Sequence, residues 1–151
     1  MDAVTGVVRR RHPDRRVTLK RLLSIVLFVI GALIGLGGFG HSFMGRLAVD
    51  AEISKFPIAF DVDSMLYVVW YFVGGCMVLF GAIILWAWFR CRKGDATLLP
   101  VTGLIGGLYI ATGLGGFFYR RHDPFMLMFL VQGALLVVCS IGLRGAPRVR
   151  G

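Results

Sequence analysis

The sequence predicts an all-α integral membrane protein, a four-helix bundle with four transmembrane spans. Of its 151 residues, 57% are hydrophobic and only 17% are charged, whereas about a quarter of a soluble domain is charged. Four stretches of at least 20 residues carry no charged side chain, and about 20 helical residues cross the ~30 Å hydrocarbon core of a bilayer. The spans are expected at about 20–41, 65–89, 97–119 and 124–143.

A basic tail, residues 1–18, precedes the first span, and a second basic tail, 146–151, follows the fourth. The transmembrane domain is expected between them, over 19–145. The first apolar run is too long for a signal peptide and is followed by no small-x-small cleavage site. We therefore interpret it as a retained helix.

A long outer loop, 42–64, joins the first two spans and has a partial helical pattern. Apolar residues recur at four-residue intervals from Phe43 to Ala51, with charged residues between them. A short interfacial helix before Pro57 fits this pattern, and so does an ordinary folded loop.

Acidic residues mark the starts of the later spans. Asp63 with Ser64 can cap the second span, and Asp95 can cap the third. Asp123 is followed directly by Pro124, and proline suits the first position of a helix because its missing N–H leaves no bond unmade there. The fourth span therefore has the most strongly marked start.

The charges indicate the orientation of the chain. With the N-terminus placed in the cytoplasm, thirteen Lys and Arg residues fall on the cytoplasmic side and four on the outer side. This positive-inside bias places both termini in the cytoplasm. It also explains the net charge of +9 without nucleic acid, and membrane lipids are the expected partners. The many Arg, Gly and Ala residues, with few Lys, indicate a GC-rich bacterial genome, so the expected location is the bacterial inner membrane.

The pentapeptide Gly-Leu-Gly-Gly-Phe occurs twice, at Gly35–Phe39 and Gly113–Phe117. An offset of 78 residues aligns the first span with the third, and a looser offset of 58 aligns the second with the fourth, placing Gly75 on Gly133. This predicts two parallel helix hairpins, a 2+2 arrangement about an axis along the membrane normal. A chance match of two short glycine-rich motifs is the alternative.

Small residues also recur every four positions along the first and third spans. Such stripes let helix backbones approach closely within a membrane, so we expect the first span to pack against the third or against a neighbouring subunit. A glycine-lined pore is the alternative. The expected packing residues are Gly31, Gly35, Gly38, Gly103, Gly107, Ala111 and Gly115.

No Asp, Glu, Lys, Arg or His lies deep within a span, which argues against an ion-coupled transporter or proton pump. The strongest polar group at depth is Gln132. We expect it to form a hydrogen bond with Thr112 or with a backbone carbonyl, and a ligand contact is the alternative. The three cysteines include no Cys-x-x-Cys pair, which disfavours a thiol oxidoreductase.

The remaining candidates gather at the outer face. Arg120 and Arg121 can hold a lipid headgroup or an acidic ligand, or they can pair with carboxylates of the long loop and hold it over the bundle. His41 and His122 are 81 residues apart, and no ligand spacing supports a metal site. No catalytic motif is visible and no cofactor is predicted.

Two segments resemble the DoxX-like group of small bacterial four-helix membrane proteins. They are Tyr71–Gly75, with the sequence Tyr-Phe-Val-Gly-Gly, and Gly115–Arg120, with the sequence Gly-Gly-Phe-Phe-Tyr-Arg. The resemblance covers most of residues 20–143 and implies a compact helical bundle; some members are associated with respiratory or redox complexes. The long outer loop and the basic tail depart from the group, and no functional residue is transferred.

The leading functional prediction is a non-enzymatic accessory or structural subunit that associates with itself or with a larger membrane complex through glycine-rich faces. The second is a binding or transport module for a lipid-like or quinone-like molecule, which would use the bundle interior and the outer arginines. The third is an enzyme or metal site at the outer face, built from the two histidines and the loop acids.

Overall fold

The computed structural model describes residues 15–144, which form helices joined by turns, with no strand in that range. Four helical segments are long and apolar enough to cross a membrane, which confirms the predicted fold class. The predicted tails lie largely outside the described residues, but 15–18 belong to the first helix. The elements are α1 (Arg15–Gly40), the π-helical turn η1 (His41–Gly45), α2 (Arg46–Ile53), α3 (Phe60–Arg92), α4 (Leu99–Tyr119), the 3₁₀ turn η2 (Pro124–Met126) and α5 (Leu127–Arg144).

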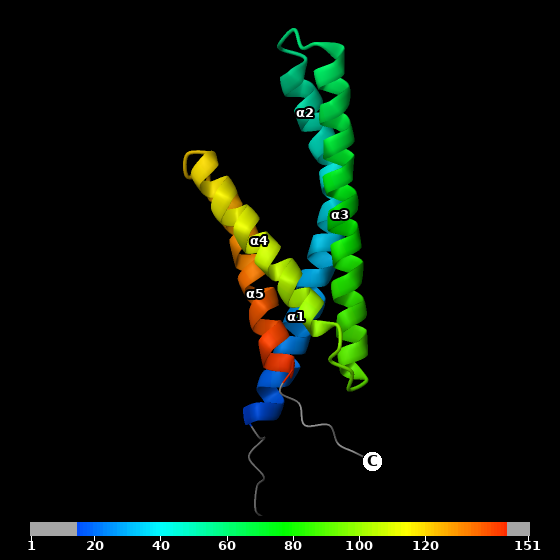
Figure 1. Cartoon of the computed structure of the whole chain (residues 1–151), viewed down its shortest axis with the longest axis vertical. Coiled ribbons are helices and arrows are strands. Elements are labelled where there is room, and N and C mark those ends of the chain that lie inside the picture. The colour runs from blue at the N-terminus through cyan, green and yellow to red at the C-terminus, as the bar shows by residue number, and fades with distance from the viewer. Residues whose placement is uncertain (1–14, 145–151) are drawn as a thin grey trace, which may run out of the picture.

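The long outer loop is mostly helical, which corrects the predicted end of the first span. Residues Val17–Ile53 form one continuous helical segment of 37 residues, and no proline lies between Val17 and Phe56 to interrupt it. The π-helical turn η1 lies in the middle of this segment. A helix does form before Pro57, as one of the two interpretations expected, but α2 continues the line of α1 beside α3 (Figure 1).

The four spans are arranged as two antiparallel hairpins that together form a V. One arm pairs α1 with α3, and the other pairs α4 with α5. The arms meet near the start of α1 and the end of α5 and diverge toward the opposite end (Figure 1). The predicted pairing of the four spans into two hairpins is therefore present. The helices form a compact bundle, as the resemblance implies, only in the region where the two arms meet.

Glycines join α1 to α3 by backbone contact. A Cβ placed on Gly81 would lie 2.5 Å from both the Cα and the N of Gly35, and one placed on Gly38 would lie 2.7 Å from the carbonyl oxygen of Gly74. Real Cβ atoms do not approach a backbone so closely. This interface therefore requires glycine at both positions, as small-residue packing in membranes predicts.

The second copy of the pentapeptide has the same role in the other arm. A Cβ on Gly113 would lie 2.6 Å from the N of Leu130, and one on Gly116 would lie 2.5 Å from the Sδ of Met126. The first and fourth positions of the motif thus face the hairpin partner in both arms. The looser alignment of the second and fourth spans, which placed Gly75 on Gly133, is wrong. Gly133 faces its hairpin partner α4, but in the second span the glycine that faces the partner helix α1 is Gly74 and not Gly75.

The predicted packing residues separate into two groups. Gly31, Gly35 and Gly38 lie against α3, and Gly103 lies against Ser140 of α5. The other three point away from the rest of the described protein. Ala111 is exposed. A Cβ placed on Gly107 or Gly115 would have no heavy atom within 4 Å. The glycine contacts thus form within each hairpin rather than between the first and third spans.

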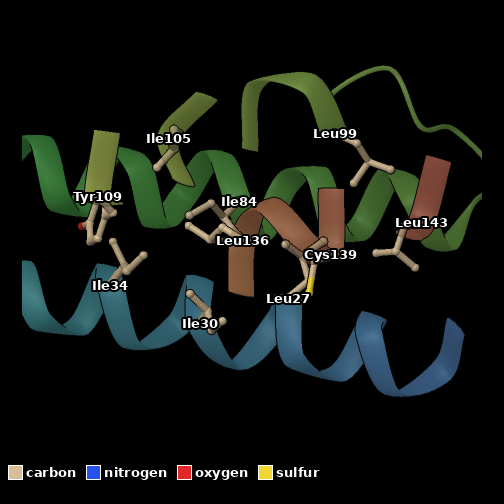
Figure 2. Close-up of a cluster of buried hydrophobic side chains, with 10 residues drawn as sticks. All are labelled: Leu27, Ile30, Ile34, Ile84, Leu99, Ile105, Tyr109, Leu136, Cys139 and Leu143. Carbon is tan, nitrogen blue, oxygen red and sulfur yellow. The ribbon is translucent and has the colours of Figure 1, made fainter. Parts of the chain in front are cut away.

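Buried side chains fill the region where the arms meet. Leu27 and Ile84 of the first arm and Leu136 and Cys139 of the second are fully buried, and all four spans contribute to the cluster (Figure 2). The thiol of Cys139 donates to the carbonyl oxygen of Leu23 at 3.4 Å. Elsewhere most apolar side chains are exposed, as expected for helices surrounded by lipid.

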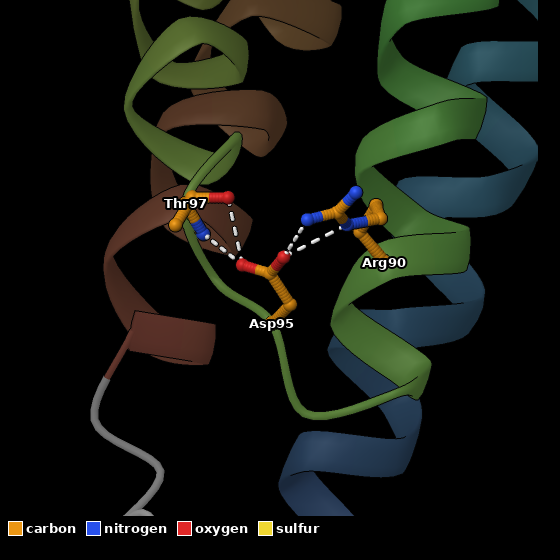
Figure 3. Close-up of polar contacts among 3 residues, drawn as sticks. All are labelled: Arg90, Asp95 and Thr97. Atoms are coloured by element: carbon orange, nitrogen blue, oxygen red, sulfur yellow. Dashed lines mark hydrogen bonds and ion pairs between the residues drawn. The ribbon is translucent and has the colours of Figure 1, made fainter.

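The turns explain where the later spans start. Asp123 caps η2 by accepting from the backbone N–H of Phe125 at 2.9 Å, which confirms the predicted cap. The second span starts earlier than predicted, at Phe60, so Asp63 lies in its first turn rather than before it. Asp95 accepts from Thr97 at the turn that leads into α4 (Figure 3).

Replacing Asp95 by alanine is expected to lower the thermal stability at neutral pH. Hydrogen bonds from Thr97, and then from Arg90, hold the pKa of this carboxyl well below its usual range. A lowered pKa contributes stability above the pKa of the unfolded chain, and this contribution is lost as the pH falls toward the folded value. Thermal unfolding in detergent should therefore show a difference at pH 7 that shrinks in acid.

The matched control for this variant is Asp61→Ala, because the Asp61 side chain makes no hydrogen bond or ion pair within residues 15–144. An equal loss of stability in both variants, or a loss that does not change with pH, would contradict the assignment.

Candidate functional site

A cavity of about 350 Å³ lies between the two arms, beyond the buried core. Both arms contribute to its wall, so it exists only because the hairpins diverge. The wall is almost entirely apolar and aromatic, which is typical of sites for small hydrophobic ligands. Its lining residues are His41, Phe72, Val73, Cys76, Met77, Phe80, Leu108, Tyr109, Thr112 and Phe129.

His41 is the first residue of the π-helical turn, and Trp70 of α3 holds it in place. The indole Nε1 donates to the carbonyl oxygen of His41 at 2.8 Å. The two rings stack with centroids 4.0 Å apart and 15° between their planes. Single π-helical turns often occur at functional sites. Here the Nε2 atom of His41 is buried and has no hydrogen-bond partner among the described residues.

Tyr109 is a second residue of the same cavity wall with a polar side chain. The residue is buried in α4, and its ring packs against Phe129 with centroids 5.8 Å apart. Its hydroxyl oxygen is also buried without a partner in the part of the chain that the structure describes. Leaving a polar group buried and unpaired costs about 1–3 kcal/mol. Two residues of one cavity wall therefore each carry this cost.

A polar cluster beside the cavity links α2 to α3. Arg46 donates to the hydroxyl of Tyr71 at 2.6 Å and pairs with Asp50 at 3.4 Å. Asp50 in turn accepts a hydrogen bond from Tyr67. These contacts fix α2 against α3 just beyond His41. Asp50 and Glu52 of the predicted loop are thus paired within their own arm, and no described acid of the loop pairs with the turn between α4 and α5.

The other outer candidates lie on the second arm, away from His41 (Figure 1). Arg120 pairs with Asp123 of the same turn at 3.1 Å and not with carboxylates of the long loop. Arg121 and His122 have positive φ angles of 53° and 70°, which are uncommon for residues other than glycine. The ring of His122 lies edge-on to Phe117, with centroids 5.0 Å apart. The two histidines are therefore not brought into one site.

The hydrogen bond expected at Gln132 is absent. Within residues 15–144 its side chain bonds neither to Thr112 nor to a backbone carbonyl. The α4 and α5 backbones contact each other at Gly113 and Gly133. Thr112 and Gln132, which directly precede these glycines, therefore lie at the sides of the contact and not between the two helices. Thr112 instead lines the cavity.

Metal and disulfide chemistry find no support in the described range. No three His, Cys, Asp or Glu side chains are grouped there so that they could hold a metal ion. Cys76, Cys91 and Cys139 are free thiols, and only Cys76 lines the cavity.

Comparison with known proteins gave no match to a family model, a curated protein or a solved structure. The fold and the apolar surface define a four-span, multi-pass membrane protein. The resemblance to the DoxX-like group stays a prediction from short motifs.

Proposed function

We propose that the protein binds a lipid-like or quinone-like molecule, with an apolar body and a carbonyl or hydroxyl oxygen, in the cavity between its arms. The observation that carries this proposal is that two residues of the largely apolar wall, His41 and Tyr109, each have a buried polar atom, Nε2 and the hydroxyl oxygen, with no partner among the described residues. Each of them can donate or accept a hydrogen bond. A ligand oxygen would satisfy them, and the aromatic wall would cover its apolar body.

This function fits the setting of the site better than an enzyme does. The cavity lies between membrane-spanning helices, where apolar molecules dissolved in the bilayer are concentrated. No pair of acidic residues and no nucleophile activated by a base lines it. Neutral hydrogen-bonding groups in an apolar wall are suited to binding a hydrophobic molecule that has a polar headgroup. They are not an arrangement that catalyses a reaction.

Tyr109→Phe is expected to weaken binding of a short-tail ubiquinone, used as the probe, by about tenfold. The change removes one oxygen and leaves the ring, and a lost hydrogen bond in an apolar site is worth about 1.4 kcal/mol. Binding can be followed through tryptophan fluorescence in mild detergent, because Trp70 stacks on His41.

The matched control is Tyr119→Phe on the same helix, since Tyr119 is 91% exposed and does not line the cavity. The proposal predicts unchanged affinity in this control. Wild-type protein that binds neither the quinone nor a co-purified lipid at this site would refute it.

We also propose that the protein is an accessory subunit. This second proposal is favoured by the face of α4 that points away from the other helices. Gly107, Ala111 and Gly115 lie on it at four-residue spacing; Ala111 is exposed, and a Cβ on either glycine would have no described heavy atom within 4 Å. Such a face can receive a helix of a second copy or of a larger complex. Particle mass in mild detergent tests this, because a strictly monomeric particle with no partner in native membranes contradicts it. The proposed location is a bacterial inner membrane with both termini in the cytoplasm.

A further inference from the structure

A second cavity, of about 320 Å³, lies at the basic end of the first arm, far from the one between the arms. Side chains of α1 and α3 line it: Arg21, Ser24, Ile25, Phe28, Trp88 and Arg92. Its volume corresponds to about ten water molecules at ~30 Å³ each. Two guanidinium groups and a hydroxyl make up the polar part of the lining, and aromatic and aliphatic side chains make up the rest.

The aromatic side chains form one wall of this cavity. Phe28 and Trp88 pack with ring centroids 4.7 Å apart. The guanidinium of Arg92 lies over the Trp88 ring, 5.1 Å from its centroid. This contact orients the Arg92 side chain without neutralising its charge.

The charges of the two arginines are not neutralised by the described part of the chain. Of the six carboxylates in residues 15–144, only Asp95 belongs to the turn between α3 and α4, and this turn lies at the same end of the protein (Figure 1). Asp95 is already bonded to Arg90 and Thr97 (Figure 3). No described carboxylate pairs with Arg21 or Arg92. Two cations therefore line a cavity in which no carboxylate of residues 15–144 pairs with them.

We propose that this cavity binds the headgroup of an anionic phospholipid. The phosphate would accept hydrogen bonds from Arg21 and Arg92, which are strong because donor and acceptor are both charged. Ser24 supplies a further donor, and the acyl chains would lie along the exposed side chains of Ile25 and Phe28. The positive-inside bias places this end at the cytoplasmic leaflet, where anionic lipids attract basic residues.

The test is native mass spectrometry of the full-length protein in detergent, titrated with phosphatidylglycerol and with phosphatidylcholine of the same acyl chains. The wild type is expected to prefer phosphatidylglycerol by about tenfold. Arg21→Gln and Arg92→Gln should each weaken phosphatidylglycerol binding about fivefold, since one basic residue near anionic lipid contributes about 1 kcal/mol. Arg21→Lys, which keeps the charge, should retain most of the preference.

The matched control is Lys93→Gln, which removes a neighbouring charge that lies over Phe89 and does not line the cavity. It should change the affinity less than twofold. Circular dichroism of each variant shows whether the helices are retained. Equal binding of both lipids by folded wild-type protein, an equal loss in Lys93→Gln, or displacement of the lipid by inorganic phosphate alone would overturn the proposal. Binding of an acidic peptide in place of the lipid would overturn it as well.

Discussion

Gly81→Ala is expected to lower the free energy of unfolding by about 1–3 kcal/mol, the usual cost of overpacking a tight interface. The added methyl group would lie 2.5 Å from backbone atoms of Gly35 and 2.8 Å from the carbonyl oxygen of Gly31. Backbone atoms cannot rotate away as a side chain can, so α1 and α3 must separate. Thermal unfolding in mild detergent, followed by circular dichroism, measures the loss.

Gly107→Ala is the matched control, because it makes the same chemical change on a helix face with no heavy atom within 4 Å. Alanine favours a helix over glycine by about 1 kcal/mol, so this variant should be as stable as the wild type or slightly more stable. Equal changes in the free energy of unfolding in the two variants would show that Gly81 is not needed for the contact between α1 and α3.

The double variant His41→Phe, Tyr109→Phe is expected to bind the short-tail ubiquinone about a hundredfold more weakly than the wild type. Each change removes the polar group proposed to bond the ligand, and one such bond is worth about tenfold in an apolar site. Phenylalanine at position 41 keeps an aromatic ring for Trp70 to stack on. Affinities of the wild type, the two single variants and the double variant form a cycle that shows whether both atoms act on one ligand.

The same double variant should not lose stability when no ligand is present. Two of the three polar atoms that it removes, His41 Nε2 and the Tyr109 hydroxyl, are buried and unpaired among the described residues, and removing an unsatisfied polar group is neutral or favourable. A loss of stability without ligand would show that the two side chains have a structural role. A double variant that binds no more weakly than either single variant would show that they do not share a ligand.

The fold was largely predictable because its signals are local. The uncharged stretches determine the spans, Asp123 before Pro124 marks a helix start, and the two pentapeptides mark the faces on which the hairpins close. The end of the first span was missed because the sequence from His41 to Ile53 mixes apolar and charged residues. Hydropathy cannot distinguish a helix that leaves the membrane from a loop.

The cavity was only partly predictable, because it depends on how two hairpins sit relative to each other. His41 was identified by its chemistry, but its partner Trp70 comes from another helix, and Tyr109 is one of several aromatic residues in an apolar span. The choice between Gly74 and Gly75 shows the difficulty: neighbouring helical positions differ by about 100° in direction, and spacing within one helix does not say which of them faces α1. An unpaired polar atom is visible only once the surroundings of each side chain are known.

The unequal lengths of the two arms have a consequence for the surrounding bilayer. The helical segments of the first arm contain 37 and 33 residues, and those of the second contain 21 each, which corresponds to rises of about 50–55 Å and about 32 Å. A hydrocarbon core of about 30 Å fits the second arm alone. The longer arm must tilt or project beyond the lipid. Because the interarm cavity lies between the mismatched arms, we expect its width, and with it the affinity for the proposed ligand, to depend on membrane thickness.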